Sequence, residues 1–343
     1  RGKPASVAPD FGVMKDEEKK MITNISDILS AQWQIGVIVA AVRLRVFSVI
    51  GDQKMELNEI SLKCDAVPDR IEPLLDACIS LGLLEFENMK YRNSHFSLVY
   101  FVEGKRFYVG EFLVLINNES IQWFQLPDLI RGKDRETIEL PGTRWDYKTF
   151  ITAMNSIALL GEADALKDTV DLSGCETITD AGGGSGLYSM SLCQKYPQLT
   201  ATILDVKETL EVTKALIAHH KEKSRIILKK GDFLNDPLGE NIDAVLLSDV
   251  IYGDSDAKIL LQNAWDSLKN NGHLIVRGYY AKPKGPGPLF GSLFAVKQMV
   301  DDPQRKIMTI TMLENNVRDI GFGNIKVTPL TEYSFILTCN KGD

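Results

Sequence analysis

The stretch that decides the fold is TITDAGGGSGLYSMS, residues 177–191. Residues 172–179 have the apolar pattern of a short buried strand, and residues from 187 onward have that of a helix. Between them, four of the five residues 182–186 are glycine, which predicts a tight turn. A strand, a glycine turn and a helix in this order are typical of a doubly wound α/β domain. The glycines let a ligand approach the backbone, and the free amides at the start of the helix attract negative charge.

Three more strands are predicted downstream of this unit. Residues 201–204 form an apolar strand that ends at Asp205, 25 residues after Asp180, where an acid is placed to bind both hydroxyls of a ribose. Residues 226–228 lead to Asp232 and Phe233, an acid and an aromatic ring suited to the amino group and the ring of an adenine. Residues 243–249 end where the central ligand crevice of such a sheet is expected.

A glycine turn by itself also fits a nicotinamide dinucleotide site. That site needs the pattern GxGxxG, whereas residues 182–187 read GGGSGL, and Asp180 would repel a pyrophosphate but suit the amino group of a methionine moiety. In order and spacing, the four signals resemble those of class I S-adenosylmethionine-dependent methyltransferases. The resemblance implies that S-adenosyl-L-methionine is the cofactor and S-adenosyl-L-homocysteine the product. The implied cofactor-binding residues are Asp180, Gly182, Gly184, Asp205, Val206, Asp232, Phe233 and Ser248.

Length and composition describe an ordinary protein of 343 residues, long enough for two domains, with 44% hydrophobic and 25% charged residues. A formal net charge of −7 without a clustered basic face argues against a nucleic-acid partner. The five cysteines have no CxxC spacing, which predicts buried thiols, a cytoplasmic location and no metal site. The apolar run 35–50 is interrupted by Arg43 and Arg45, so no membrane-spanning segment is predicted.

The N-terminal third is expected to be helical. Residues 17–31 have helical periodicity, and residues 33–50 are apolar on nearly every side, so more than one face must be covered. A subunit interface explains this better than the core of the same domain. Short helices are predicted at residues 57–64 and 67–75, followed by a helix at 74–84 and a hairpin at 83–93, which is a winged-helix outline. The helix with Asp69, Glu72 and Asp76 is acidic, which argues against contact with DNA phosphates.

The run ACISLGLLE at 77–85, followed by YRNS at 91–94, resembles the dimerisation domain of small-molecule O-methyltransferases, the group with plant phenolic and bacterial polyketide and hydroxyindole enzymes. The resemblance covers residues 17–340. It implies an α/β protein and a homodimer in which a Rossmann-like methyltransferase domain follows a mostly α-helical winged-helix dimerisation domain. The implied divisions are a flexible arm at 1–16, a dimerisation domain at 17–110, a helical pocket-lining segment at 111–160 and the cofactor-binding domain at 161–343.

The same resemblance suggests residues for the acceptor pocket. Phe150 and Met154 match a Phe-x-x-x-Met pattern that opens the helix before the glycine turn in this group, although a helical core pair at positions i and i+4 explains them equally well. The predicted apolar helix 289–299 carries Phe290 and Phe294, which are well placed to line an acceptor pocket.

The catalytic half of the site departs from the family. Where phenolic O-methyltransferases carry a proton-removing His, this chain has Tyr252, and Arg277 and Ile307 replace the two carboxylates that flank that His. None of the four histidines, at positions 95, 219, 220 and 273, is expected to replace it: residues 219 and 220 are predicted on a charged helix, and residue 273 at the far side of the sheet.

Several chemical hypotheses remain open. Three roles are open for Tyr252, whose side chain has an ordinary pKa near 10. It acts as a base whose pKa is lowered by Arg277, it holds the acceptor by a hydrogen bond, or it only packs. An acceptor such as a carboxylate or an activated carbon needs no strong base, and bacteriochlorophyll-ring carbon methyltransferases of this group also carry Tyr at this place. Arg277 is a candidate partner for an acidic acceptor. The predicted function is O- or C-methylation of a small molecule by direct displacement. The alternative is a dimeric homologue that binds the cofactor without transferring the methyl group, or that catalyses a different reaction.

Overall fold

The computed structural model describes residues 16–136, 138, 146–279, 289–304, 308–331 and 334–342, with side chains from residue 25 onward. Most of the predicted arm at 1–16, the predicted loop at 283–288 and Ile307 lie outside these residues. The chain divides into two compact units, of which the first ends at Leu98 and the second begins at Val99.

The first unit is mostly helical, with one hairpin. Its elements are α1 (Asp16–Arg43), α2 (Val46–Ile50), α3 (Leu57–Lys63), α4 (Pro68–Ser80), β1 (Leu84–Glu87), β2 (Lys90–Asn93) and the beginning of α5 (His95–Tyr100). Strands β1 and β2 pair antiparallel, as the sequence predicts. Two predicted boundaries are wrong. Helix α1 runs through residue 32 and ends only before Arg45, which has a positive φ of 59°. Helix α4 is continuous where two helices were expected.

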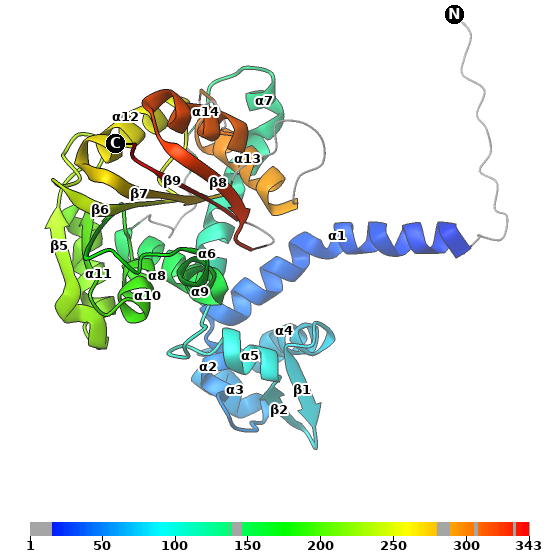
Figure 1. Cartoon of the computed structure of the whole chain (residues 1–343). Coiled ribbons are helices and arrows are strands. Elements are labelled where there is room, and N and C mark those ends of the chain that lie inside the picture. Colours follow the sequence, from blue (N-terminus) through cyan, green and yellow to red (C-terminus); the bar gives the residue numbers. More distant parts are fainter. Residues whose placement is uncertain are drawn as a thin grey trace, which may run out of the picture. The chain divides into compact units, whose positions relative to one another are not determined.

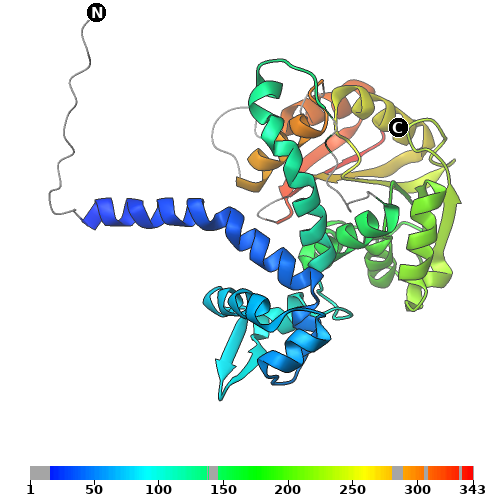
Figure 2. The ribbon, with the colours of Figure 1, turned by 180° about the vertical axis from the view of Figure 1, so that it is seen from behind.

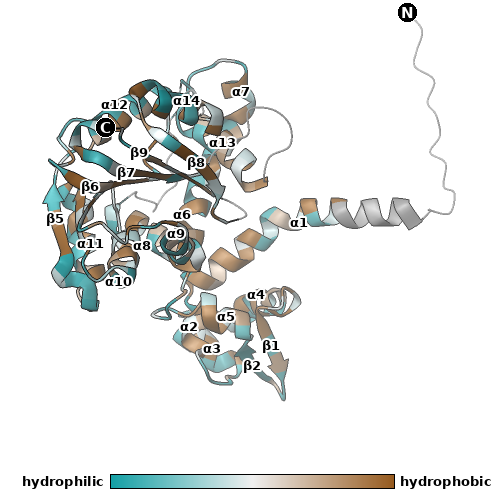
Figure 3. Cartoon of the chain, viewed as in Figure 1, coloured by the Kyte–Doolittle hydropathy of each residue, from teal (hydrophilic) through white to brown (hydrophobic). Residues whose placement is uncertain are grey.

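Four large apolar side chains of helix α1 recur at helical spacing, form one stripe and are exposed. Much of the α1 ribbon toward Arg43 has the hydrophobic colour in Figure 3. Ile25, Ile28, Leu29 and Trp33 are 53%, 74%, 69% and 76% exposed within this chain. Residues Ile25–Arg43 are also long and apolar enough to cross a membrane by length and composition, and 17% of that stretch is buried. Arg43 and Arg45 do not exclude a span here, because this apolar stretch begins at Ile25, before residue 35, and ends at Arg43.

The second unit begins with helices and continues as an alternation of strands and helices. Its first elements are α6 (Gly110–Glu119), η1 (Ser120–Gln125), α7 (Leu126–Ile130), α8 (Tyr147–Ile157), η2 (Ala158–Glu162) and α9 (Ala163–Thr169). The alternating part comprises β3 (Thr177–Ala181), α10 (Leu187–Lys195), β4 (Thr200–Asp205), α11 (Lys207–Ile217), η3 (Lys221–Arg225), β5 (Ile226–Lys230), β6 (Ile242–Ser248), α12 (Asp254–Ser267), β7 (Leu268–Gly278), α13 (Leu289–Asp301), α14 (Ile310–Ile320), β8 (Gly323–Pro329) and β9 (Phe335–Asn340). The first predicted strand begins at Thr177 and not at residue 172, since the preceding residues form a turn.

The strands of this unit form one sheet in the order β5-β4-β3-β6-β7-β9-β8. The pairs from β5 to β7 are parallel, and the pairs β7–β9 and β9–β8 are antiparallel. Helices α9, α10 and α11 pack on one face and α12 and α14 on the other, each over its own hydrophobic cluster (Figure 1). Figure 2 shows the same layers from behind. Because β3 is paired to β4 on one side and β6 on the other, its carboxyl end lies where such sheets bind ligands.

The turn after β3 accepts only glycine at two positions. Gly182 and Gly186 have φ angles of +70° and +77°. A Cβ at Gly182 would lie 2.5 Å from Val250 Cγ1, and one at Gly186 would lie 2.8 Å from Ile203 Cδ1. The glycines are therefore required both by backbone conformation and by close packing.

Candidate active site

The glycine turn is tied by hydrogen bonds to the end of β4, which is also bonded to the residue after β5. Gly182 N donates to Leu204 O at 2.8 Å, and Gly231 N donates to Asp205 O at 3.0 Å. Gly184 N donates to the Asp205 carboxylate, with 3.0 Å between the amide nitrogen and Oδ2. These bonds bring three predicted cofactor-binding residues to one edge of the sheet.

The predicted cofactor-binding residues Asp232 and Phe233 lie on the loop after β5. A Cβ at Gly182 would lie 3.0 Å from the Phe233 ring, so this ring closes over the turn. The Asp232 carboxylate is exposed and accepts hydrogen bonds from Leu234 N at 3.0 Å and Asn235 Nδ2 at 2.6 Å. It is therefore held within its own loop in this structure, while its predicted contact with an adenine stays a prediction.

Asp205 is a buried acid, 7% exposed, whose two oxygens each accept one backbone amide. Oδ2 accepts from Gly184 N, and Oδ1 accepts from Val206 N at 2.8 Å. Burial raises the pKa of this carboxyl, although the two amide donors oppose the shift. A carboxylate oxygen can accept more than one hydrogen bond, so Asp205 retains acceptor capacity for the two hydroxyls of a ribose.

Asp180 lies beneath the turn, with no exposed surface. Its Oδ2 accepts from Ser189 Oγ at 2.7 Å, and its Oδ1 has no hydrogen-bond partner among the described residues. Burial raises the pKa of this carboxyl to about 7, against the lowering effect of Ser189. Ser248 Oγ, at the end of β6, is likewise buried without a partner in the described part of the chain. Two unpartnered polar atoms beside a glycine cradle fit a ligand with polar groups of its own.

Arg277, a predicted catalytic residue, is 3% exposed and forms an internal ion pair. Its Nη2 and Nε lie 2.6 Å and 3.1 Å from Oε2 of Glu162, which is 5% exposed. Glu162 also accepts from Thr331 Oγ1 at 2.7 Å and from Ser334 Oγ at 2.6 Å. Burial alone would raise the pKa of Glu162, but the Arg277 charge and the hydroxyl donors outweigh burial, so that this pKa is lowered. The guanidinium is thus held by Glu162, which does not favour its predicted role as partner of an acidic acceptor.

The predicted acceptor residues of α13 join the same cluster. The Arg277 guanidinium carbon lies 4.3 Å from the centre of the Tyr279 ring and 5.7 Å from that of Tyr188. Tyr279 in turn contacts Phe290 and Phe294, with ring centres 5.0 Å and 5.2 Å apart. Arg277, Tyr279 and the two phenylalanines therefore form one continuous group of side chains.

The remaining predicted residues lie on segments that reach this edge. Tyr252 is half-buried between Val250, which packs at the glycine turn, and the start of α12. Phe150 and Met154 are half-buried on α8, whose Ile151 side chain would lie 3.7 Å from a Cβ at Gly184. Helix α8 thus lies over the turn, and the roles of Phe150, Met154 and Tyr252 stay predictions.

Two family models match this chain. The O-methyltransferase dimerisation domain matches residues 26–103, and the O-methyltransferase domain matches residues 143–313. The chain belongs to the O-methyltransferase family. It is an S-adenosylmethionine-dependent methyltransferase with a helical N-terminal dimerisation domain and a Rossmann-like C-terminal domain.

The relatives of this methyltransferase cover most of its length. A 3-hydroxy-5-methyl-1-naphthoate 3-O-methyltransferase of Streptomyces sahachiroi is 26% identical over 294 residues, 81% of this chain and 83% of the relative. An acetylserotonin O-methyltransferase of Macaca mulatta is 26% identical over 285 residues, 77% of this chain and 82% of the relative. The structure of human N-acetylserotonin methyltransferase in complex with SAM has the same fold, with a TM-score of 0.84, 23% identity and coverage of 96% of this chain and 100% of that chain.

Three side chains that contact Arg277 were not predicted from the sequence: Glu162, Tyr188 and Tyr279. Glu162 is 115 residues from Arg277 in sequence, so no local pattern could pair them. Tyr188 comes just after the glycine turn, and Tyr279 comes just after β7. Their positions in the sequence next to predicted site residues could have indicated them.

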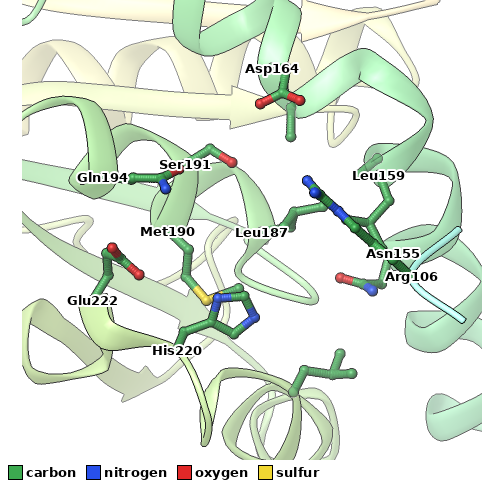
Figure 4. A pocket seen from close by; sticks show the side chains of 13 residues that line it. Arg106, Asn155, Leu159, Asp164, Leu187, Met190, Ser191, Gln194, His220 and Glu222 are labelled. Atoms are coloured by element: carbon green, nitrogen blue, oxygen red, sulfur yellow. The ribbon is translucent and has the colours of Figure 1, made fainter. Parts of the chain in front are cut away.

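A separate cavity of about 370 Å³ lies elsewhere in the methyltransferase domain. Figure 4 shows Arg106 on one wall and Gln194 and Glu222 on the facing wall. None of the residues that line it is a predicted cofactor, acceptor or catalytic residue, so this cavity is distinct from the edge described above.

Two of the four histidines differ from expectation in their local structure. His219 and His220 follow the end of α11 and do not lie on a helix, and His220 lines the separate cavity. His273 lies at the middle of β7, opposite Ala244, and its Nδ1 is 3.1 Å from Asn340 Nδ2. Among the described residues, no group of three or more His, Cys, Asp or Glu is arranged to hold a metal ion.

Proposed function

We propose that this methyltransferase is a homodimer that methylates an oxygen or a ring carbon of a hydroxylated aromatic small molecule. The observation that carries the proposal is the aromatic group of Tyr279, Phe290 and Phe294 next to the predicted cofactor edge. Flat aromatic rings favour offset or edge contacts with another flat ring.

The relatives support the same acceptor class. Those named above act by name on a hydroxynaphthoate and on acetylserotonin. An L-tyrosine C(3)-methyltransferase of Streptomyces lavendulae is 31% identical over 133 residues, 38% of this chain and 36% of the relative. All three names describe a hydroxylated aromatic acceptor, and the third describes transfer to carbon.

Different residues of this chain would bind the cofactor and align the acceptor in such a transfer. S-adenosylmethionine, when bound, supplies an activated methyl group on a positively charged sulfur. Asp205 and the glycine turn would hold its adenosyl portion, with Phe233 over the base. The aromatic group would align the acceptor for an in-line displacement, and alignment is a large part of the rate enhancement in reactions with a good leaving group.

The homodimer is supported by the stripe on α1 and by the match to a dimerisation domain. Four large apolar side chains exposed along a single stripe are unfavourable in water and mark an interaction surface.

A cytoplasmic location is proposed because the five cysteines, at positions 64, 78, 175, 193 and 339, are buried free thiols.

A direct experiment tests the acceptor class. The purified full chain is incubated with methyl-labelled S-adenosylmethionine and a panel of hydroxynaphthoates, N-acetylserotonin, L-tyrosine, aliphatic carboxylic acids and tetrapyrroles, and the products are identified by mass spectrometry. We expect label in at least one hydroxylated aromatic compound. Turnover of only aliphatic or tetrapyrrole acceptors would contradict the proposed class. Cofactor binding without turnover of any compound would favour the homologue that lacks methyl transfer, for which the replacement of the family His by Tyr252 is the motivating observation.

A further inference from the structure

Of the four glycines in the turn after β3, Gly184 is the least closely packed. A Cβ added at Gly182, Gly183 or Gly186 would lie 2.5, 2.7 or 2.8 Å from a neighbouring side-chain atom. At Gly184 the nearest atom, Ile151 Cδ1, would be 3.7 Å away, which is an ordinary contact distance. Gly184 has a φ of +52°, and glycine adopts positive and negative φ about equally readily. Packing therefore does not fix this residue, and its hydrogen bonds must hold it.

Both backbone polar groups of Gly184 are bonded to the unit formed by β4 and α11. Its amide donates to Oδ2 of Asp205, the last residue of β4, at 3.0 Å. Its carbonyl accepts from Oγ1 of Thr213 at 2.5 Å. Thr213 lies on α11, which begins at Lys207, two residues after Asp205. The two bonds restrain the peptide planes on either side of Gly184, and thereby its φ and ψ.

The Thr213 side chain contacts the turn through both of its branches. It has no exposed surface. Its methyl carbon Cγ2 would lie 3.3 Å from a Cβ at Gly186, and its hydroxyl donates to Gly184 O. A β-branched side chain with one polar and one apolar branch therefore fits this position.

The hydroxyl has a second acceptor within reach, the carbonyl of Thr209 at 2.9 Å. A bond to the carbonyl four residues earlier is common for threonine in helices, and it carries no function by itself. The hydroxyl has only one proton, however, and its shorter distance is the one to Gly184 O. In the described part of the chain, no backbone amide donates to Gly184 O. The Thr213 hydroxyl is therefore the donor that satisfies this carbonyl.

We propose that Thr213 is a positioning residue for S-adenosylmethionine. Its hydroxyl holds the Gly184 carbonyl, so that the Gly184 amide stays bonded to Asp205 and keeps the carboxylate where it would accept the ribose hydroxyls. Without this bond Gly184 has other backbone conformations open to it, and the apparent affinity falls with the fraction of molecules in the binding geometry. The proposal rests on the part of the proposed function in which Asp205 holds the adenosyl portion, and not on the acceptor class.

Two substitutions separate the hydroxyl of Thr213 from its methyl group. Thr213→Val removes the hydroxyl and keeps the branched shape, whereas Thr213→Ser keeps the hydroxyl and removes the methyl group. Calorimetry with S-adenosylhomocysteine and the full chain measures the dissociation constant without turnover. We expect Thr213→Val to raise this constant at least about fivefold, which is the scale of one hydrogen bond, and Thr213→Ser to stay within about twofold of wild type.

A merely structural role gives a different result. It lowers the midpoint of thermal unfolding in Thr213→Val and leaves the dissociation constant of the folded protein unchanged, and that outcome would overturn the proposal. If Thr213→Val does not fold, Thr213→Ala replaces it, with Thr213→Ser as the reference. Both of these variants lack the methyl group, and only Thr213→Ala lacks the hydroxyl.

Two control variants match the change in chemistry and in burial. Thr169→Val makes the same substitution on α9, where Thr169 Oγ1 donates to Ala165 O at 2.8 Å, also four residues earlier. Ser97→Ala removes a fully buried hydroxyl that donates to Leu83 O at 2.7 Å in the first unit. Both controls should bind S-adenosylhomocysteine as wild type does. A loss of affinity in Ser97→Ala equal to that in Thr213→Val would mean that the effect is general destabilisation, against the proposal.

A double variant tests whether Thr213 acts through Asp205. In Asp205→Ala no carboxylate remains for the Gly184 amide to hold, so addition of Thr213→Val should weaken binding by less than about twofold more. An equal effect of Thr213→Val in both backgrounds would contradict the proposal, and so would an Asp205→Ala protein that binds as tightly as wild type. A protein that shows the expected binding and methylates nothing in the panel counts against the proposed acceptor class alone, because all of these measurements are of binding.

Discussion

Arg277 and Glu162 form a buried ion pair, with 2.6 Å between Nη2 and Oε2, that joins β7 to η2 across 115 residues of sequence. The hydroxyl groups of Thr331 and Ser334 also donate hydrogen bonds to the Glu162 carboxylate. The ion pair holds the Arg277 guanidinium against the Tyr279 ring, and Tyr279 in turn contacts the aromatic rings of α13.

Removal of one partner should be costly. Glu162→Gln removes the carboxylate that is hydrogen-bonded to the buried Arg277 guanidinium, and breaking a buried ion pair in this way costs about 3–5 kcal/mol of unfolding free energy. We expect the double variant Glu162→Gln/Arg277→Met to lose less than Glu162→Gln alone. Urea denaturation monitored by circular dichroism measures both. Asp164→Asn, which breaks the exposed pair between Asp164 and Lys167, should cost no more than about 1 kcal/mol. Equal losses in the buried and exposed variants would show that the buried pair is not a structural constraint.

The buried acid Asp180 predicts a pH dependence of stability. Its pKa is about 7 in the folded chain and about 3.9 when unfolded, so between these values the folded state binds more protons than the unfolded state. Stability of the ligand-free protein should therefore fall as pH rises from about 4 to about 7. Asp180→Asn removes this contribution, and its denaturation midpoint should depend less on pH over that range. Identical pH profiles for wild type and variant would mean that the Asp180 carboxyl is ionised throughout.

The Asp205 carboxylate should contribute directly to cofactor affinity. We expect Asp205→Ala to weaken S-adenosylmethionine binding at least tenfold, about 1.4 kcal/mol, because the ribose hydroxyls lose their acceptor. Isothermal calorimetry measures the dissociation constant, with Asp232→Ala as a second variant at the predicted adenine contact. An Asp205→Ala dissociation constant equal to that of wild type would remove Asp205 from the site.

A variant of Tyr252 tests whether this residue contacts the acceptor. If Tyr252 holds the acceptor by a hydrogen bond, Tyr252→Phe should lower turnover modestly, by about tenfold, and leave cofactor affinity unchanged. Steady-state kinetics on an acceptor from the panel, with calorimetry for the cofactor, separate the two effects. Full activity in Tyr252→Phe would indicate that the residue only packs at the crevice edge.

How far the sequence predicts this molecule depends on whether the determining contacts are local. The glycine turn and Asp205 could be identified because a tight turn and an acid at a strand end leave a fixed local pattern, and the strands from Thr177 to Ser248 followed from their apolar runs. The break of α1 could not be placed, since it depends on one left-handed residue, Arg45, in an otherwise helical pattern. The partner of Arg277 could not be predicted either. Glu162 has no local signal, and its pairing exists only because the fold brings η2 next to β7.

The stripe on α1 leads to a prediction about assembly. Ile25, Ile28, Leu29 and Trp33 recur at spacings of three and four residues and so lie on one side of the helix, whereas Gln34 lies on the opposite side. A charge placed in the stripe must be desolvated when a second copy covers it, so Leu29→Glu should weaken the dimer at least about 100-fold, about 3 kcal/mol. Gln34→Glu adds the same charge on the other side and should leave the dimer intact. Sedimentation velocity across a concentration series measures both variants against wild type. A Leu29→Glu protein as dimeric as wild type would show that this stripe is not the interface, and a wild type that is monomeric at every concentration would exclude the homodimer itself.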